Sequence, residues 1–330
     1  MSYHGPPVAK WSAAIDRSAL SQADEDSAPC NFTIVTWNAW FAQYRQQERA
    51  CSLLGEALAQ GPHVLCLQEV TDELHEAMLQ AVGFRQRLSP TEEYTPSLDG
   101  YDVTMWVRPD IEVLRRWTVS LPSLMQRRCL VVDLAGHTTA NVRVAAVHLE
   151  SNQQGESSAK LRAEQLQAII PRLRAEPFPL QCRPDLTLLV GDFNFHDADG
   201  LESAVLSADG CITDTWDAVR PGERGYTEDT TVNRMLAQRQ EGQTKQVRYD
   251  RVLVVKPRGA DTSTGAADSA NLWAPWNTAL LGTKEFSAGV WPSDHFGLLA
   301  RFRRGTNVRL LAGHHHQLLV FTFVLLGNQR

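Results

Sequence analysis

Polar side chains recur at the carboxyl ends of apolar runs that have the length of strands. Asp192 and Asn194 close one run, His148 and Glu150 close a second, and Glu69 lies at the end of a third. The carboxyl ends of strands in an α/β sheet usually border the crevice in which ligands bind. Alternate residues of a strand face the same side, so each pair presents two polar groups to one surface. Several such endings together indicate a shared polar site.

Two further segments add polar groups of the same kind. Asn38 follows the apolar run 31–37, and Asp294 and His295 lie between a Pro-Ser turn and another apolar run. A histidine that acts on phosphate needs a carboxylate to hold one tautomer or its positive charge, and Asp250 is a candidate for that role. Taken singly, each motif has a plainer interpretation as a turn after a buried strand or a solvated strand end.

These residue types suit the hydrolysis of a phosphodiester. The reaction needs charge neutralisation on the phosphoryl oxygens, an aligned nucleophile and stabilisation of the leaving oxygen. A hard cation such as Mg²⁺ prefers oxygen ligands and keeps several waters, so one or two protein carboxylates are enough to hold it.

The segments predicted to position these groups alternate between strands and helices. Apolar runs of strand length alternate with stretches of helical period, and in 47–60 the residues Leu53, Leu54, Ala57 and Leu58 recur at spacings of three and four. Further helices are predicted over 71–84 and 157–170. The predicted strands are 31–37, 63–70, 102–107, 129–134, 142–149, 186–193, 249–255 and 297–302.

The motifs TWN, LQEV, HLES, GDFN, YDRVL and SDHFGL occur in this order between residues 36 and 298. Together they resemble the endonuclease/exonuclease/phosphatase superfamily, and HLES and WPSDHFGL are most similar to its tyrosyl-DNA phosphodiesterases. The resemblance implies an α/β fold, a four-layered α/β sandwich with two packed mixed β-sheets flanked by helices and one site at a sheet rim. It also implies Mg²⁺ as cofactor, with Mn²⁺ able to substitute.

The resemblance assigns a role to each matching residue at the metal. Glu69 would be the principal Mg²⁺ ligand, with Asn38 and Asp294 close to the ion or its waters. Tyr101, Arg127 and the neighbouring Arg128 are candidates for contact with the substrate, and so is Glu150. The alternatives for these candidates are a packing aromatic and a solvated strand end.

The catalytic roles follow in the same way. Asp192 would position and deprotonate the attacking water, and Asn194 would help to hold that water and the phosphate. His148 would donate to the phosphoryl oxygens, as would His295 oriented by Asp250.

Three positions depart from the pattern of the tyrosyl-DNA phosphodiesterases. Trp40 stands where they carry an aspartate, so one acidic group of the site is missing. His196 replaces an arginine that contacts the DNA end, and Glu228 replaces an aromatic residue. The last two changes are expected to weaken the grip on DNA.

Composition limits the partners and the compartment. A formal net charge of −6 excludes a protein that coats nucleic acid through its overall field, so contact with nucleic acid must be local. The six cysteines form no CxxC pair, which favours a reducing compartment. There is no secretory signal pattern, so we expect the protein in the nucleus and/or the cytoplasm, as a monomer. No dense basic cluster addresses the chain to the nucleus, so entry there would need another route.

Three segments do not share the α/β pattern. Residues 1–30 are interpreted as a flexible leader, followed by a catalytic domain over 31–304 in which 256–272 is an inserted loop. Residues 305–330 form a C-terminal tail of unknown role. Its apolar run 318–326 is too short to span a membrane as a helix, and is either an extra strand or an aggregation-prone segment. The histidine run 314–316 is interpreted as solvated rather than metal-binding.

Three hypotheses for function remain open. The first is a DNA repair phosphodiesterase that acts on a DNA 5′ end blocked by a protein adduct. The second is another phosphodiesterase of the superfamily, such as a deadenylase-like poly(A) ribonuclease. The third is a catalytically silent binding module that retained the fold.

Overall fold

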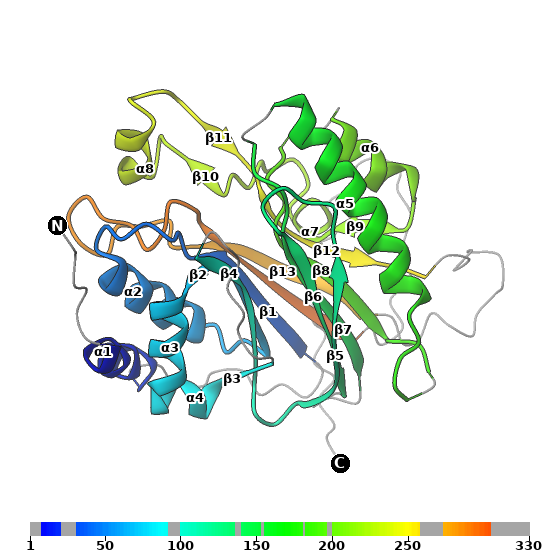
Figure 1. Cartoon of the computed structure of the whole chain (residues 1–330), viewed down its shortest axis with the longest axis horizontal. Helices are drawn as coiled ribbons and strands as arrows, with labels where there is room; N and C mark the ends of the chain where they lie inside the picture. Colours follow the sequence, from blue (N-terminus) through cyan, green and yellow to red (C-terminus); the bar gives the residue numbers. More distant parts are fainter. Residues whose placement is uncertain are drawn as a thin grey trace, which may run out of the picture.

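Two six-stranded β-sheets lie between outer helices in the computed structural model of the chain (Figure 1). The structure describes residues 8–20, 31–91, 100–135, 140–152, 155–180, 182–196, 200–257 and 273–304. Both sheets contain parallel and antiparallel pairs. The prediction of a four-layered α/β sandwich with two packed mixed sheets is therefore confirmed.

The first sheet has β1 and β2 at its centre, where both strands are almost entirely buried. β1 runs parallel to β2 and antiparallel to β14. In order across the sheet, the strands are β13 (Trp273–Leu281), β14 (Gly297–Arg304), β1 (Asn31–Asn38), β2 (Val64–Thr71), β4 (Tyr101–Val107) and β3 (Ser89–Pro90).

The second sheet fixes the register of three predicted site residues. His148 ends β7 directly opposite Asp192 of β8, and Asp192 is in turn opposite Asp250 of β12. The three side chains thus begin on neighbouring strands at one edge. In order across the sheet, the strands are β5 (Glu112–Ser120), β6 (Arg128–Ala135), β7 (Asn141–His148), β8 (Leu186–Asp192), β12 (Asp250–Val255) and β9 (Ile212–Asp214).

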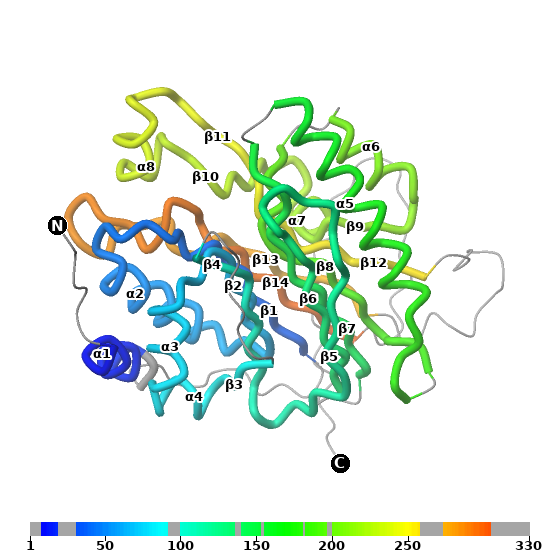
Figure 2. Tube along the Cα trace, viewed as in Figure 1, coloured from blue at the N-terminus to red at the C-terminus, as the bar shows by residue number. Residues whose placement is uncertain are grey.

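Helices form the two outer layers, and a small hairpin projects beyond them (Figure 2). The first sheet is covered by α1 (Val8–Leu20), α2 (Gln46–Leu58), α3 (Asp72–Gln80) and α4 (Val82–Arg87), and the second by α5 (Glu156–Ala175) and α6 (Leu201–Ala208). α7 (Thr215–Val219) follows β9. The projecting hairpin consists of β10 (Glu228–Asp229), α8 (Arg234–Arg239) and β11 (Gln246–Val247).

The core lies between the two sheets. Ile34 and Val64 of the first sheet pack in one cluster with Val144 and Leu188 of the second, and all four are fully buried. Burying such a side chain contributes about 1.5–3 kcal/mol. Because the apolar face of each sheet is covered by the other, the strands are held where their polar ends meet.

The helix α1 lies within the segment predicted to be a flexible leader. Trp11 and Ile15 are buried against α2, α3 and α4. The Asp16 carboxylate accepts hydrogen bonds from the first backbone N–H groups of α4, the shortest from Gly83 at 2.6 Å. The prediction of a flexible leader is therefore wrong for Val8–Leu20, because apolar burial and a cap supplied to a distant helix hold this segment in place.

The predicted strands and helices are present, but none of the four edge strands β3, β5, β9 and β13 was predicted. β5 and β13 each end a sheet, and exposed residues alternate irregularly with partly buried ones along both. Of the predicted loop 256–272, residues 258–272 lie outside the described residues, and so does the tail 305–330. No helix among the described residues is long and apolar enough to cross a membrane.

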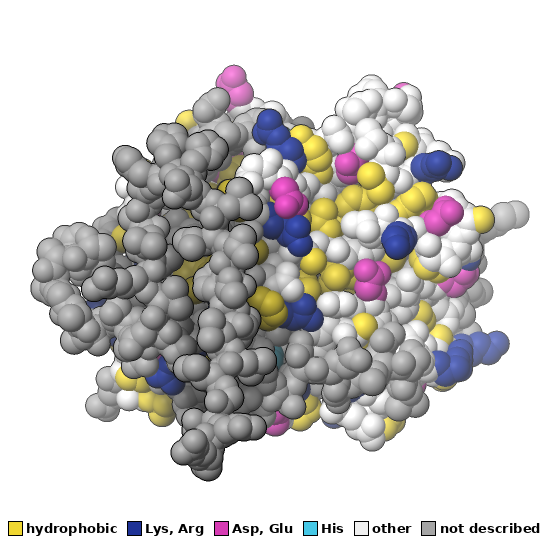
Figure 3. Space-filling view, turned by 180° about the vertical axis from the view of Figure 1, so that it is seen from behind, with side chains coloured by type: hydrophobic (Ala, Val, Ile, Leu, Met, Phe, Trp, Pro, Cys, Tyr) yellow, Lys and Arg dark blue, Asp and Glu magenta, His cyan; other side chains and the backbone are white. Residues whose placement is uncertain are grey.

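Seen from the side opposite to Figure 1, the described surface carries basic, acidic and hydrophobic side chains interspersed with one another (Figure 3). On this face, no single sign of charge dominates among the described residues. The polar residues at the rim of the two sheets are the candidates for a functional site.

Candidate active site

Asp192 lies where the two sheets meet. Its Oδ2 accepts a hydrogen bond of 3.0 Å from Asn38 Nδ2 at the end of β1, in the other sheet. His148 Nε2 lies 3.5 Å from the same oxygen. The backbone N–H of Asn194 donates to the other carboxylate oxygen at 2.9 Å. The structure thus brings together four residues that the sequence placed at the ends of three separate strands.

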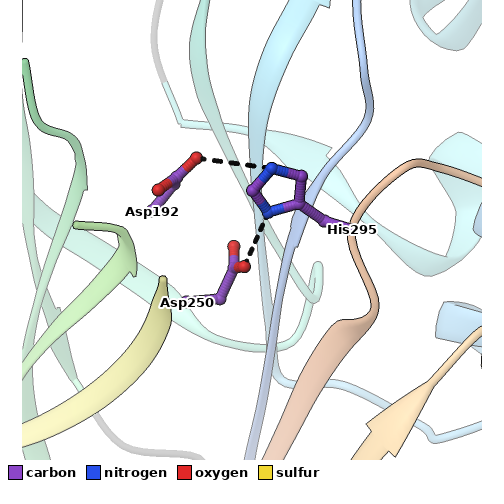
Figure 4. Close-up of side chains that lie close together, drawn as sticks. All are labelled: Asp192, Asp250 and His295. Carbon is purple, nitrogen blue, oxygen red and sulfur yellow. Dashed lines mark hydrogen bonds and ion pairs between the residues drawn. The ribbon is translucent and has the colours of Figure 1, made fainter. Parts of the chain in front are cut away.

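His295 is held between carboxylates (Figure 4). Its Nδ1 lies 2.8 Å from Asp250 Oδ2, as predicted for an orienting carboxylate. Its Nε2 lies 3.0 Å from Glu228 Oε1 and 3.9 Å from Asp192 Oδ2. Burial alone would lower the pKa of His295, but Asp250 and Glu228 raise this pKa well above its usual value. The ring is therefore an imidazolium with a donor at each nitrogen.

The environment of Asp192 brings its acidity close to neutral pH. Burial and the charge of Asp250 raise the pKa of Asp192 to about 6, against the opposing effects of His295 and the hydrogen bonds from Asn38 and Asn194. A carboxylate with a pKa near the working pH is suited to accept a proton from water.

His148 has the opposite character to His295. Burial and the positive charges of Arg127 and His295 hold the pKa of His148 well below its usual value, so the ring is neutral. Its Nδ1 is buried and has no hydrogen-bond partner among the described residues. The two histidines therefore differ in charge, which their sequence motifs do not reveal.

Glu69 and Asp294 form the oxygen-rich end of the site. Glu69 accepts a hydrogen bond of 3.1 Å from the backbone N–H of Phe41. Burial and the charge of Asp294 raise the pKa of Glu69 to about 7. Burial also raises the pKa of Asp294, whose Oδ2 lies 2.8 Å from an Arg239 guanidinium nitrogen. Two carboxylates that disfavour each other's charge suit a hard divalent cation, which would favour the charged forms.

A second group of side chains could also hold a metal ion. Asp192, Asp250 and His295 each place one ligand atom within 4.8 Å of the others. Both nitrogens of His295 already face carboxylates, whereas Asp250 Oδ1 is buried and has no hydrogen-bond partner among the described residues. Both places therefore offer carboxylate oxygens of the kind that a hard cation prefers.

Three site residues adopt left-handed backbone conformations. Trp40, Glu69 and Asn194 have φ angles of 57°, 56° and 55°. Such conformations cost about 1–3 kcal/mol each and persist where the surrounding structure enforces them. Glu69 lies where the register between β2 and β4 shifts, and such an irregularity re-aims a side chain.

Trp40 stands where the resemblance implies an aspartate, and its ring contacts two guanidinium groups. The guanidinium carbons of Arg49 and Arg239 lie 4.3 and 4.4 Å from its ring centroids. Arg49 is buried and donates to backbone carbonyls on both sides of the site, including those of Trp40 and Pro292. Trp40 is thus a buried aromatic in contact with two guanidinium groups, and no motif in the sequence marked either arginine.

Tyr101 and Arg127 flank His148, as expected for candidates near the substrate. The Tyr101 ring centroid lies 6.3 Å from that of His148 and 4.7 Å from that of the partly exposed Phe41. Arg127 lies over the Tyr101 ring at 5.3 Å and donates to its hydroxyl at 3.3 Å. Phe41, which was not predicted, extends this aromatic surface.

Glu150 shapes a loop and does not join the cluster around Asp192. Its carboxylate accepts from Ser123 Oγ at 2.6 Å and from the backbone N–H of Leu124 at 3.0 Å. Ser123 Oγ in turn accepts from the backbone N–H of Arg127 at 2.8 Å. Glu150 therefore positions the loop that carries Arg127.

Glu228 and Lys245 also belong to the site, although the sequence did not predict either as a site residue. Glu228 is buried and paired with both His295 and Lys245. Burial opposes its ionisation, but His295 and Lys245 lower the pKa of Glu228 to about 2. The only sequence signal was an acid at a position where similar proteins carry an aromatic. His196, another departure, accepts a hydrogen bond of 3.0 Å from the backbone N–H of Arg248.

Known proteins resemble this chain over most of its length. A model described as the Endonuclease/Exonuclease/phosphatase family matches residues 35–295. Tyrosyl-DNA phosphodiesterase 2 of Gallus gallus is 29% identical over 275 residues, which are 82% of this chain and 67% of that protein. The same enzyme of Xenopus laevis is 26% identical over 89% of this chain and 71% of its own length.

Solved structures share the fold. A crystal structure of D. rerio TDP2 complexed with single strand DNA product has a TM-score of 0.66 at 20% identity and covers 84% of this chain and 100% of that one. The human Nocturnin catalytic domain with bound sulfate anion has a TM-score of 0.61 at 16% identity, over 87% of this chain and 98% of that one.

Proposed function

The chain belongs to the Endonuclease/Exonuclease/phosphatase family, and from that premise we propose that it hydrolyses phosphodiester bonds with the help of a divalent metal ion. One observation supports this most directly. Asp192, whose pKa is raised to about 6, lies beside Asn38, the neutral His148 and the positively charged His295. A base, hydrogen-bond donors and a cation beside one another are what attack on a phosphodiester requires.

The proposed metal is Mg²⁺, with Mn²⁺ able to substitute. Glu69 would hold it, with Asp294 and Asn38 close to the ion or its waters. The ion would neutralise charge on the phosphoryl oxygens, which is the part of the chemistry that the protein's own groups supply least.

The protein groups perform the other steps. Asp192 accepts the proton of the attacking water, and Asn194 helps to hold that water and the phosphate. His295 donates from Nε2 to a phosphoryl oxygen, while Asp250 keeps the ring charged and oriented. His148 is neutral and donates from a single nitrogen.

We further propose that the substrate is a DNA 5′ end that carries a protein adduct, and that the protein is a monomer acting in DNA repair in the nucleus and/or the cytoplasm. The relatives named Tyrosyl-DNA phosphodiesterase 2 support the substrate. So does the surface of Phe41, Tyr101 and Arg127 beside His148, because aromatic faces stack on bases and a guanidinium pairs with phosphate.

A substrate panel tests the proposal. The purified chain is incubated with Mg²⁺ and a 5′-tyrosyl oligonucleotide, poly(A) RNA, an abasic duplex or a phosphoinositide. We expect release of tyrosine from the oligonucleotide. Trimming of poly(A) without that release would favour the deadenylase-like alternative.

The third hypothesis, a silent binding module, is separated by the same panel. It would prevail if no substrate were hydrolysed and Asp192→Asn changed nothing. The buried and mutually oriented base and histidines argue against it, because a binding module does not need a carboxylate with a pKa near neutrality.

A further inference from the structure

His295 already binds an anion that belongs to the protein itself. Glu228 Oε1 lies 3.0 Å from Nε2, the nitrogen that is not used by Asp250. The glutamate is 6% exposed, so this contact is an internal one. Each ring nitrogen has one N–H, which makes a full-strength hydrogen bond to one acceptor at a time.

Nε2 of His295 also lies close to Asp192, the general base of the proposed reaction. It lies 3.9 Å from Asp192 Oδ2, the oxygen that also receives the hydrogen bond from Asn38. A water activated by Asp192 must attack a phosphorus whose oxygens lie close by, and Nε2 is the protonated ring donor on that side. In the free protein, Glu228 therefore occupies the donor that a phosphoryl oxygen needs.

We propose that Glu228 is an internal competitor of the substrate, whose carboxylate occupies His295 Nε2 in the free protein and gives up this donor to a phosphoryl oxygen when a phosphodiester binds. The inference rests on the proposed function and deepens it. It identifies a residue that sets how tightly the site binds an anionic substrate.

Lys245 provides a partner for the Glu228 carboxylate after that carboxylate leaves His295. It is paired with Glu228 in the free protein, and its ammonium lies 4.9 Å from the Tyr249 ring centroid. Its backbone N–H donates to Thr230 Oγ1 at 2.8 Å, which fixes the lysine within the hairpin. A buried carboxylate without a partner is costly, so a retained ion pair with Lys245 makes the release of His295 feasible.

Substitutions of Glu228 and of Lys245 should have opposite effects on the KM for a phosphodiester. Glu228→Gln removes the competing charge and keeps the shape, so the KM for a phosphodiester should fall by about three- to tenfold, as expected for losing one charge-assisted hydrogen bond from the competitor. Lys245→Met removes the alternative partner of Glu228, so the carboxylate should remain on His295 and KM should rise by a similar factor.

The experiment measures steady-state kinetics of the full chain with Mg²⁺ and bis(p-nitrophenyl) phosphate, and inhibition by inorganic phosphate. The inhibition constant should follow KM, falling in Glu228→Gln and rising in Lys245→Met. If both variants shift these constants in the same direction, or if neither shifts them, the competitor role is overturned. A merely structural role would weaken both variants alike, and thermal unfolding shows whether either has lost its fold.

Calorimetric titration with inorganic phosphate separates this inference from the proposed function. If the wild-type protein hydrolyses no phosphodiester but phosphate binds in the order Glu228→Gln, wild type, Lys245→Met, the proposed function fails and the competitor role stands. If hydrolysis is found and this order is absent, the proposed function stands and the competitor role fails.

Discussion

Individual residues in this site derive their chemistry from neighbours that are distant in the sequence. Asp192 and Asn38 are 154 positions apart, and His295 and Asp250 are 45 apart. The sequence placed Asn38 and Asp192 after apolar runs, and Asp250 and His295 before them, because polar groups next to apolar runs are visible in a single chain. It could not assign their charge states, which depend on burial and on side chains brought close by folding.

The first prediction concerns Asp192. Asp192→Asn should lower kcat by about 100- to 10,000-fold, because a well-placed general base contributes that much. The midpoint of thermal unfolding should not fall, since burial and Asp250 disfavour the charge that the substitution removes. The exposed Asp110→Asn is the matched control and should retain full activity. A change of less than tenfold in Asp192→Asn would assign the base to another group.

The second prediction concerns Asp250. Activity should fall as pH decreases through the pKa of Asp192, about 6, and as pH increases through the pKa of His295, which lies well above its usual value. Asp250→Asn removes a charge that raises both values. Both limbs of the profile of kcat/KM against pH should therefore move to lower pH. A shift of only one limb, or a shift to higher pH, would contradict this assignment.

At the scale of elements, the sequence predicted the buried strands and missed the exposed ones. Central strands such as β1 and β8 are covered on both faces and are buried almost throughout. β5 and β13 lie at sheet edges, where solvent allows polar residues to interrupt the alternation. α1 was missed for a different reason, since what holds it is contact with helices that follow it in the chain.

The third prediction tests how α1 is held. Ile15→Ala should lower the free energy of unfolding by about 2–5 kcal/mol, because it removes a buried side chain and leaves a cavity. Arg17→Ala changes an exposed residue of the same helix and should have little effect. Urea denaturation measures both. Equal stability of the two variants would mean that α1 does not dock in solution.

At the scale of the whole molecule, the site exists only where both sheets are correctly packed. Asn38, Glu69 and Asp294 come from the first sheet or its connections, and Asp192 and Asp250 come from the second. The order of motifs along the chain predicted the family fold, and it named most of the residues around Asp192 but neither Glu228 nor Lys245 as part of the site. The ion pairs made by the hairpin that carries Glu228 and Lys245 depend on how that hairpin folds over the rim, which no motif specifies.

The fourth prediction concerns the metal ion, which should be detectable through the effect of pH on stability. The folded-state pKa of Glu69, about 7, lies above its ordinary value of 4.5, so its ionisation destabilises the folded protein. In the presence of a chelator this penalty should be absent below pH 4.5, grow between pH 4.5 and 7, and be complete above pH 7. A bound divalent cation favours the charged form. Mg²⁺ should therefore raise the midpoint of thermal unfolding more at pH 8 than at pH 5.

The matched variant for this experiment is Glu69→Gln. Without metal at pH 8 it should be at least as stable as the wild type, because the repelled charge is gone. It should also lose most of the stabilisation by Mg²⁺, which for a specific site amounts to about 2.7 kcal/mol at an ion concentration 100 times the Kd. Equal stabilisation of both proteins by Mg²⁺ would place the ion elsewhere, with the group formed by Asp192, Asp250 and His295 as the next candidate.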